Sequence, residues 1–128
     1  MIYLDTSVAL AHLLAEDRLP RASLWAESLV SSRMLEYELW IRIHARGLGG
    51  SHGEPVRELI GRVALLELAP PVLGRAIEPF PSPVRSLDAL HLASADFLRQ
   101  QGQLVRIATY DHRFADAARA MGFDLFEA

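Results

Sequence analysis

The sequence predicts an α/β protein with three layers, in which a central, mostly parallel sheet of four to five strands lies between helices. Short apolar runs alternate along the chain with segments whose apolar residues recur at helical spacing. Such alternation is typical of a parallel sheet with helices on both faces. The 128 residues, 51% of them hydrophobic and 23% charged, suit one globular domain with a substantial core. We expect this domain to span residues 1–128.

The first predicted strand is the apolar run Ile2–Leu4, which stops at Asp5. Apolar residues then recur at helical spacing up to Leu14, so a helix should follow the strand directly. Ligands of α/β sheets bind beyond the carboxyl ends of the strands, which makes Asp5 a candidate functional residue. Alternatively, Asp5 caps the helix by accepting a bond from a free backbone N–H group. A second helix is predicted at Pro20–Leu29 and a second strand at Val30–Ser32.

A third helix is predicted at Met34–Arg46, and it carries two glutamates. Glu36 and Glu38 lie ~200° apart on a helical wheel, so they cannot both face one site. Both have apolar neighbours at helical spacing, and periodicity alone does not choose between them.

The glycine-rich segment 47–53 is predicted to be a flexible loop. It resembles a nucleotide-binding loop only superficially, since it follows no strand and lacks lysine. Beyond it the pattern predicts a helix at Glu54–Val63, a strand at Ala64–Leu68 and a short helix at Pro70–Ile77. Three prolines between residues 79 and 83 then predict a stiff linker.

The segment from Ser86 to Asp96 predicts the first turns of a long helix with Ser86 as its N-cap. Asp88 falls in the first turn, where free N–H groups and the positive end of the helix dipole favour a carboxylate. His91 lies one turn further and is predicted to pack against a neighbouring element, with contact to Asp88 as the alternative. Asp96 is predicted to be a solvated or capping acid.

The last part of the chain predicts a strand at Val105–Thr109, a helix with an apolar face, and a short strand at Asp124–Phe126. Gly102 and Gly122 are placed to end the two preceding helices, because glycine readily adopts the left-handed conformation found there. Asp111 follows the fourth strand just as Asp5 follows the first.

Three aspartates should therefore meet at one edge of the sheet, namely Asp5, Asp88 and Asp111. With one glutamate from the third helix, four carboxylates converge in a chain that has no lysine. Such crowding is electrostatically costly, and a divalent cation relieves the cost. Oxygen ligands suit Mg²⁺ or Mn²⁺ rather than zinc. The expected reaction is hydrolysis of a phosphodiester by a metal-activated water.

Composition excludes several other chemistries. Without cysteine the chain has no disulfide, thiolate metal site or cysteine nucleophile, and without lysine it has no Walker-type phosphate loop or Schiff base. A net charge of −3 gives no overall attraction to nucleic acid, so cations would have to mediate binding to a polyanion. No apolar run is long enough for a membrane span, and no signal peptide is evident, so we expect a cytoplasmic protein.

Several motifs, in this order and spacing, resemble a PIN domain of the VapC toxin type. The most specific part is the segment Asp88–Ala95, and the first strand with its aspartate is next. The matching motifs are Ile2-Tyr3-Leu4-Asp5-Thr6-Ser7, Ser32 with Glu38 six residues later, Ser86-Leu87-Asp88-Ala89-Leu90-His91-Leu92-Ala93-Ser94-Ala95, and Ala108-Thr109-Tyr110-Asp111 followed by Phe114, Ala117 and Ala118.

The resemblance implies a PIN-like α/β/α fold and a Mg²⁺-dependent ribonuclease that is the toxin of a toxin–antitoxin pair. Its partners would be RNA, a cognate VapB-like antitoxin and a second copy of itself. The metal ligands carried over are Asp5, Glu38, Asp88 and Asp111, with Mn²⁺ as a possible substitute for Mg²⁺. The resemblance selects Glu38 over Glu36, and Asp116 is the substitute candidate for Asp111. Hydroxyls of Thr6 or Ser7 and of Thr109 would orient the carboxylates.

Other functions compete with this interpretation. A response-regulator receiver domain and a haloacid-dehalogenase-type phosphatase share the architecture, but both rely on a lysine that the chain lacks. A catalytically silent PIN fold that only binds protein is the alternative from another class.

For the homodimer, we expect a surface patch of four apolar residues, Trp25, Leu39, Trp40 and Ile43, because symmetric burial of such a patch is the commonest route to an oligomer.

Overall fold

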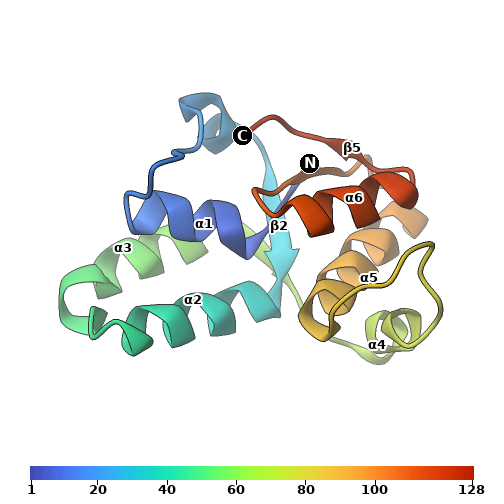
Figure 1. Cartoon of the computed structure of the whole chain (residues 1–128), viewed down its shortest axis with the longest axis horizontal. Coiled ribbons are helices and arrows are strands. Elements are labelled where there is room, and N and C mark those ends of the chain that lie inside the picture. The colour runs from blue at the N-terminus through green and yellow to red at the C-terminus, as the bar shows by residue number, and fades with distance from the viewer.

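The computed structural model describes residues 1–128 and contains one parallel sheet with strand order β3-β2-β1-β4-β5 (Figure 1). The strands are β1 (Ile2–Leu4), β2 (Leu29–Ser32), β3 (Val63–Leu66), β4 (Arg106–Ala108) and β5 (Asp124–Leu125). The helices are α1 (Thr6–Leu13), α2 (Arg33–Ala45), α3 (Gly49–Gly61), α4 (Pro70–Ala76), α5 (Ser86–Gln100) and α6 (His112–Ala120). A 3₁₀-helix covers Ala22–Ala26. The predicted three-layer α/β/α class is confirmed.

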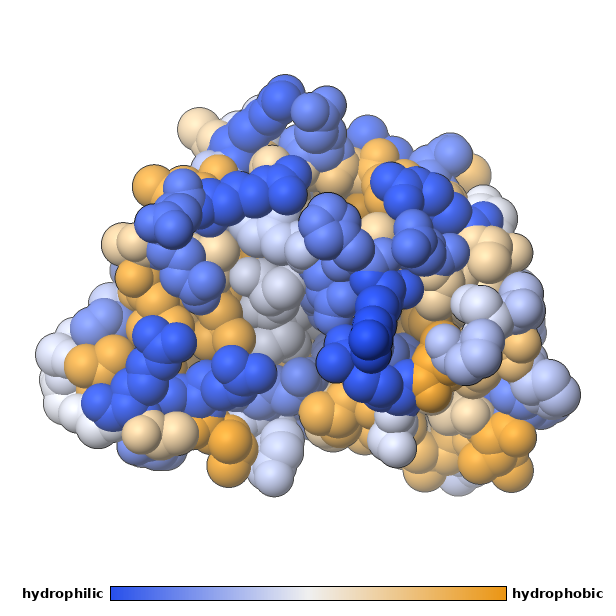
Figure 2. All heavy atoms as spheres, in the orientation of Figure 1, coloured by the Kyte–Doolittle hydropathy of each residue, from blue (hydrophilic) through white to orange (hydrophobic).

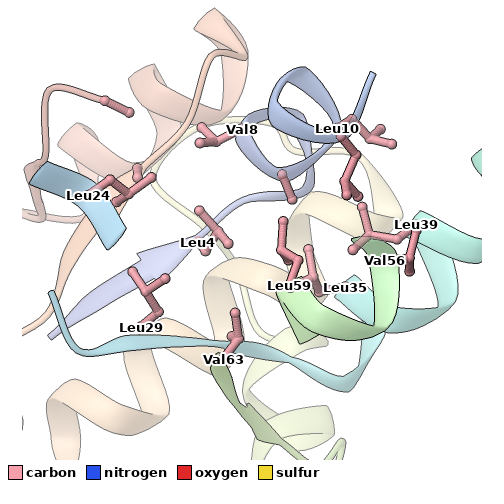
Figure 3. Close-up of a cluster of buried hydrophobic side chains, with 14 of the residues drawn as sticks. Leu4, Val8, Leu10, Leu24, Leu29, Leu35, Leu39, Val56, Leu59 and Val63 are labelled. Atoms are coloured by element: carbon pink, nitrogen blue, oxygen red, sulfur yellow. The ribbon is translucent and has the colours of Figure 1, made fainter. Parts of the chain in front are cut away.

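Side chains of the central strand β1 alternate between two separate cores. Ile2 and Leu4 belong to a cluster of 16 buried residues with α1, α2 and α3, part of which Figure 3 shows. Tyr3 points the other way, into a cluster of 10 buried residues with α5 and α6. Because both faces of the sheet are covered, the central strand β1 is apolar and buried throughout, as expected inside a parallel sheet.

The parallel arrangement decides where a site can form. Every strand pair in the sheet is parallel, so all five carboxyl ends lie along the same edge. The chain leaves β1 at Asp5 and leaves β2 at Ser32, and each of these residues caps the helix that follows. Side chains that are distant in sequence are thereby collected at this edge.

Two predicted segments have a different structure. The helix predicted at Pro20–Leu29 is wrong, since only a 3₁₀-helix at Ala22–Ala26 forms and Leu29 begins β2. Pairing of Leu29 with Ile2 and Val63 on either side outweighs its local helical pattern.

The loop predicted at 47–53 is also partly wrong, because α3 begins at Gly49. Glycine is a poor helix former, yet Val56 and Leu59 of this helix are buried in the core, and that packing stabilises the helix. At the start of α5, Arg85 rather than Ser86 is the N-cap residue, and no side chain bonds the free N–H groups there.

The predicted helix ends at the two glycines are confirmed. Gly102 and Gly122 have φ angles of +89° and +86°, and each lies two residues after the last residue of its helix, α5 or α6. Only glycine adopts this left-handed conformation without a steric cost, which explains its use at both turns. None of the helices combines the length and the apolar character needed to cross a membrane.

Candidate active site

A cleft of about 550 Å³ lies beside the carboxyl ends of the strands, and it brings together the four predicted acids. Asp5 comes from the end of β1, Glu38 from α2, Asp88 from the first turn of α5, and Asp111 from the start of α6. Figure 2 shows this face of the molecule, where hydrophilic side chains gather around a hollow near the middle. The predicted convergence of these residues is therefore present in the structure.

Asp5 is held at the floor of the cleft and is only 6% exposed. Its Oδ2 accepts hydrogen bonds from the Ser7 hydroxyl at 2.6 Å and the Thr109 hydroxyl at 2.8 Å. The same oxygen accepts a longer bond of 3.4 Å from the Ser7 backbone N–H, which makes Asp5 the N-cap of α1. Asp5 therefore caps α1 through Oδ2 and also lines the cleft, where its Oδ1 accepts no hydrogen bond from the protein.

Glu38 faces the cleft and Glu36 does not. Glu38 Oε1 accepts a hydrogen bond from the Thr6 hydroxyl at 3.1 Å. The same oxygen lies 2.6 Å from His91 Nε2. Glu36 instead forms an ion pair with Arg33 outside the cleft. The core explains this choice, because the buried face of α2 points inward and fixes which glutamate meets the sheet edge.

Asp88 and Asp111 share one guanidinium. Arg85 donates through Nε to Asp88 Oδ2 at 3.2 Å and through Nη2 to Asp111 Oδ2 at 2.8 Å. Burial raises the pKa of Asp88 above its ordinary value, and the hydrogen bond from Arg85 offsets this only in part. The neighbouring charges of Asp111 and Asp5 raise the Asp88 pKa further.

Asp111 and its substitute candidate occupy different places. Asp111 lines the cleft and caps α6, since its Oδ1 accepts from the backbone N–H groups of Arg113 and Phe114. Asp116 does not line the cleft, is largely exposed, and forms an ion pair with Arg119 on the surface of α6. The geometry thus favours Asp111 over Asp116 as the fourth acid of the cleft.

Two side chains on α5 have partners that the sequence did not reveal. His91 contacts Glu38 rather than Asp88, and its other ring nitrogen is 2.7 Å from the Tyr3 hydroxyl. Asp96 is buried, and it accepts hydrogen bonds from Arg75 and Arg99, so the prediction of a solvated acid is wrong. Glu38, Tyr3 and Arg75 come from segments far away in the sequence, where periodicity carries no signal. Arg99 is different, because it lies one turn further along α5.

The rim of the cleft also holds positive charge. Arg18 and Arg42 line it together with Arg85. Arg18 and Arg42 have no acidic partner, and the guanidinium of Arg18 lies 4.3 Å from the centre of the Tyr110 ring. No sequence motif marks these arginines, so they were not among the predicted site residues.

The donor set of the cleft fits a hard divalent cation. Its carboxylates offer only oxygen, the ligand that Mg²⁺ and Mn²⁺ prefer, and the neighbouring hydroxyls orient some of them. Asp5 Oδ1, Glu38 Oε2 and Asp88 Oδ1 accept no hydrogen bond from the protein. No three acidic side chains are close enough as they stand to surround an ion. In this structure the guanidinium of Arg85 occupies one carboxylate oxygen each of Asp88 and Asp111.

Comparison with known proteins agrees with this geometry. Residues 2–120 match the family described as PIN domain. The chain belongs to the PIN-domain family. A relative named Ribonuclease VapC47 from Mycobacterium tuberculosis is 34% identical over 96% of this chain and 93% of its own. Ribonucleases VapC46 and VapC35 of the same species are 33% and 30% identical, each over 94% of this chain and 92% of their own.

These matches place the PIN domain described here among those of the VapC type. They cover nearly the whole chain and include every element that contributes an acid to the cleft. No solved structure matches the chain. The family resemblance expected from the motifs is therefore confirmed by whole-chain similarity.

Proposed function

We propose that this PIN domain is a metal-dependent endoribonuclease and the toxin of a toxin–antitoxin pair. The observation that carries the proposal is the convergence of four carboxylates from four separate segments on one cleft. The ribonuclease names of the VapC relatives support the substrate class. The reaction is hydrolysis of RNA phosphodiester bonds, and its setting is the cytoplasm.

Asp5, Glu38, Asp88 and Asp111 would hold Mg²⁺, or Mn²⁺ in its place. When bound, the cation supplies Lewis-acid chemistry, since it lowers the pKa of water and stabilises charge on phosphoryl oxygens. The protein contributes orientation: Thr109 and Ser7 fix Asp5, and Thr6 fixes Glu38. Asp111 is the only one of the four with hydrogen bonds on both carboxylate oxygens, because it caps α6 through Oδ1 and accepts from Arg85 through Oδ2.

The arginines at the rim explain how an acidic protein can bind a polyanion. Arg18 and Arg42 lack acidic partners and stand beside the carboxylates, where phosphate groups of a bound strand would pass. Arg85 becomes available to a phosphate once it releases its two aspartates. Guanidinium groups bind phosphate oxygens through two parallel hydrogen bonds, so a few well-placed arginines suffice for a short strand.

The decisive experiment compares two glutamates on the same helix. Glu38→Gln should reduce Mg²⁺-dependent RNA cleavage by orders of magnitude, because it removes a cation contact while keeping the size of the side chain. Glu36→Gln, two residues earlier on α2 and outside the cleft, should cleave at the wild-type rate. Cleavage is measured on total RNA with sequencing of the new ends, and circular dichroism confirms that both variants fold.

The same samples test the alternative of a catalytically silent binding module. A ribonuclease binds Mn²⁺ in calorimetry and loses all cleavage in EDTA, and Asp88→Asn weakens both the binding and the cleavage. A silent PIN fold binds its partner protein, cleaves nothing and is indifferent to EDTA. Full cleavage in EDTA by pure protein would contradict the metal-dependent mechanism.

We also propose a cognate VapB-like antitoxin and a homodimer as the protein's assemblies. The antitoxin proposal rests on the VapC names of the relatives. To test it, the chain is expressed in a bacterial host with and without the neighbouring small open reading frame, and co-expression should abolish toxicity. The homodimer proposal rests on apolar side chains that remain exposed on the outer face of α2, Tyr37 and Ile41.

A further inference from the structure

A buried chain of hydrogen bonds connects the middle of the sheet to one acid of the cleft. The Tyr3 hydroxyl, fully buried on β1, lies 2.7 Å from His91 Nδ1, and His91 Nε2 lies 2.6 Å from Glu38 Oε1. His91 is 1% exposed, so water does not compete for either ring nitrogen. At its inner end, the Tyr3 oxygen accepts the backbone N–H of Ser32 at 3.1 Å.

The partners determine which ring nitrogen of His91 carries the proton. The Glu38 carboxylate can only accept a hydrogen bond, so His91 Nε2 carries a proton and donates it to Glu38 Oε1. In a neutral imidazole Nδ1 then has no proton and accepts one from the Tyr3 hydroxyl, whose oxygen accepts the Ser32 N–H.

This arrangement fixes one oxygen of Glu38 from two directions. Oε1 accepts from His91 on α5 and from the Thr6 hydroxyl on α1, while Oε2 accepts nothing from the protein. A glutamate side chain has three freely rotating bonds, and holding one oxygen leaves the other with few positions. His91 in turn cannot rotate without breaking its bond to a tyrosine that is packed in the core.

We propose that His91 is a positioning residue for Glu38, and that Tyr3 holds the imidazole in the orientation and tautomer that this task requires. This inference rests on the proposed function, because a fixed orientation of Glu38 matters only if Glu38 binds a cation in the cleft. It accounts for a histidine and a tyrosine that are almost completely buried and hydrogen-bonded to each other.

The test separates a hydrogen-bond donor from a filler of space. His91→Phe keeps an aromatic ring in the core but has no N–H group, so Mn²⁺ affinity in calorimetry should fall about 10-fold. In His91→Gln the amide N–H can still donate to Glu38 and the amide oxygen can accept from Tyr3, so most of the affinity should return. His44→Phe, an exposed histidine on α2 away from the cleft, should bind Mn²⁺ like the wild type.

Two further readouts do not depend on activity. Nitrogen NMR of the metal-free wild type should show His91 protonated on Nε2, and Tyr3→Phe should shift the Nδ1 signal because its donor is gone. Thermal melting of all variants shows whether Mn²⁺ affinity follows the presence of the N–H donor or merely follows stability.

The outcomes are distinguishable. Two results would overturn the positioning role and leave the proposed function standing. One is a proton on Nδ1 of His91 in the wild type. The other is a Mn²⁺ affinity equal to that of the wild type in both His91→Phe and His91→Gln. Affinity that tracks melting temperature across the variants would also overturn it, since any packing residue would then do the same. A wild type that binds no Mn²⁺ at all overturns the proposed function, and this inference with it.

Discussion

At the scale of single residues, the arginines differ in whether a nearby acid holds them and in whether they line the cleft. All thirteen basic side chains are arginines, and most of them are held by a nearby acid. The arginines without an acidic partner are Arg18, Arg42, Arg46 and Arg113, and the first two line the cleft. An unpaired guanidinium beside four carboxylates is free to bind an anionic strand, whereas a paired one would first have to break an ion pair.

We therefore predict that Arg18 and Arg42 carry much of the RNA affinity. Each substitution, Arg18→Ala or Arg42→Ala, should weaken binding of a non-cleavable RNA and lower the slope of log affinity against log salt by about 0.7. Arg113→Ala is the matched control, because this arginine is also unpaired but lies outside the cleft. Binding is measured by fluorescence anisotropy over a range of salt concentrations, and equal slopes for all three variants would contradict the prediction.

At the scale of elements, Asp96 attaches α4 to α5. Its Oδ2 accepts from Arg75 of α4 at 2.8 Å, and its Oδ1 accepts from Arg99 of α5 at 2.8 Å. An isolated helix as short as α4 is marginal in water, so contacts of this kind are needed to stabilise it. Burial alone would raise the pKa of Asp96, but the hydrogen bonds from the two arginines outweigh it, and the pKa lies below its usual range.

The sign of this shift gives a prediction for stability against pH. A carboxyl group with a depressed pKa in the folded state stabilises the fold above its unfolded pKa, and this contribution disappears as the pH falls through the folded value. Asp96→Asn should therefore cost about 1–3 kcal/mol of unfolding free energy at neutral pH, with the difference from wild type shrinking in acid. Urea unfolding at several pH values measures it.

Asp116→Asn serves as the control for this experiment. Its carboxylate forms an exposed ion pair with Arg119, and exposed pairs contribute little. A loss for Asp96→Asn that stays constant from neutral to acid pH would show that the ionised carboxylate is not what holds α4 in place.

At the scale of the whole molecule, the structure changes which residues could form a dimer interface. Leu39 and Ile43, two of the four residues predicted for the patch, are completely buried in the core of the protomer. Trp25 and Trp40 are partly buried and pack against that same core. The prediction of this particular patch is wrong. Leu39 and Ile43 lie on the face of α2 that packs against α1 and α3, so they are not available to a second copy.

The exposed face of α2 is the better candidate for self-association. Tyr37 and Ile41 are 58% and 49% exposed and lie one helical turn apart, so they form neighbouring apolar side chains. We expect light scattering at micromolar concentration to give the mass of a dimer, and Ile41→Glu to give a monomer by placing a charge in the contact. Leu104→Glu, at an even more exposed apolar residue outside the helices, should leave the dimer intact. A monomeric wild type would contradict the homodimer.

Local sequence determined the order of the elements and the acids that follow them. Alternation of apolar runs predicted the parallel sheet, and a strand that stops at Asp5 or just before Asp111 already places those residues at the sheet edge. These features depend on spacing along the chain, which the sequence displays directly. Resemblance to a family supplied the choice of Glu38, which periodicity had left open.

Only the tertiary structure decided which side chains meet. Residues far apart in sequence come together in the contact of His91 with Glu38, in the ion pair of Asp96 with Arg75, and in the position of Arg18 beside the acids. The same reason explains why Leu29 joined a strand, since its pairing partners lie on β1 and β3. Burial and hydrogen bonding between distant segments outweigh local preference, and no pattern within a single segment records them.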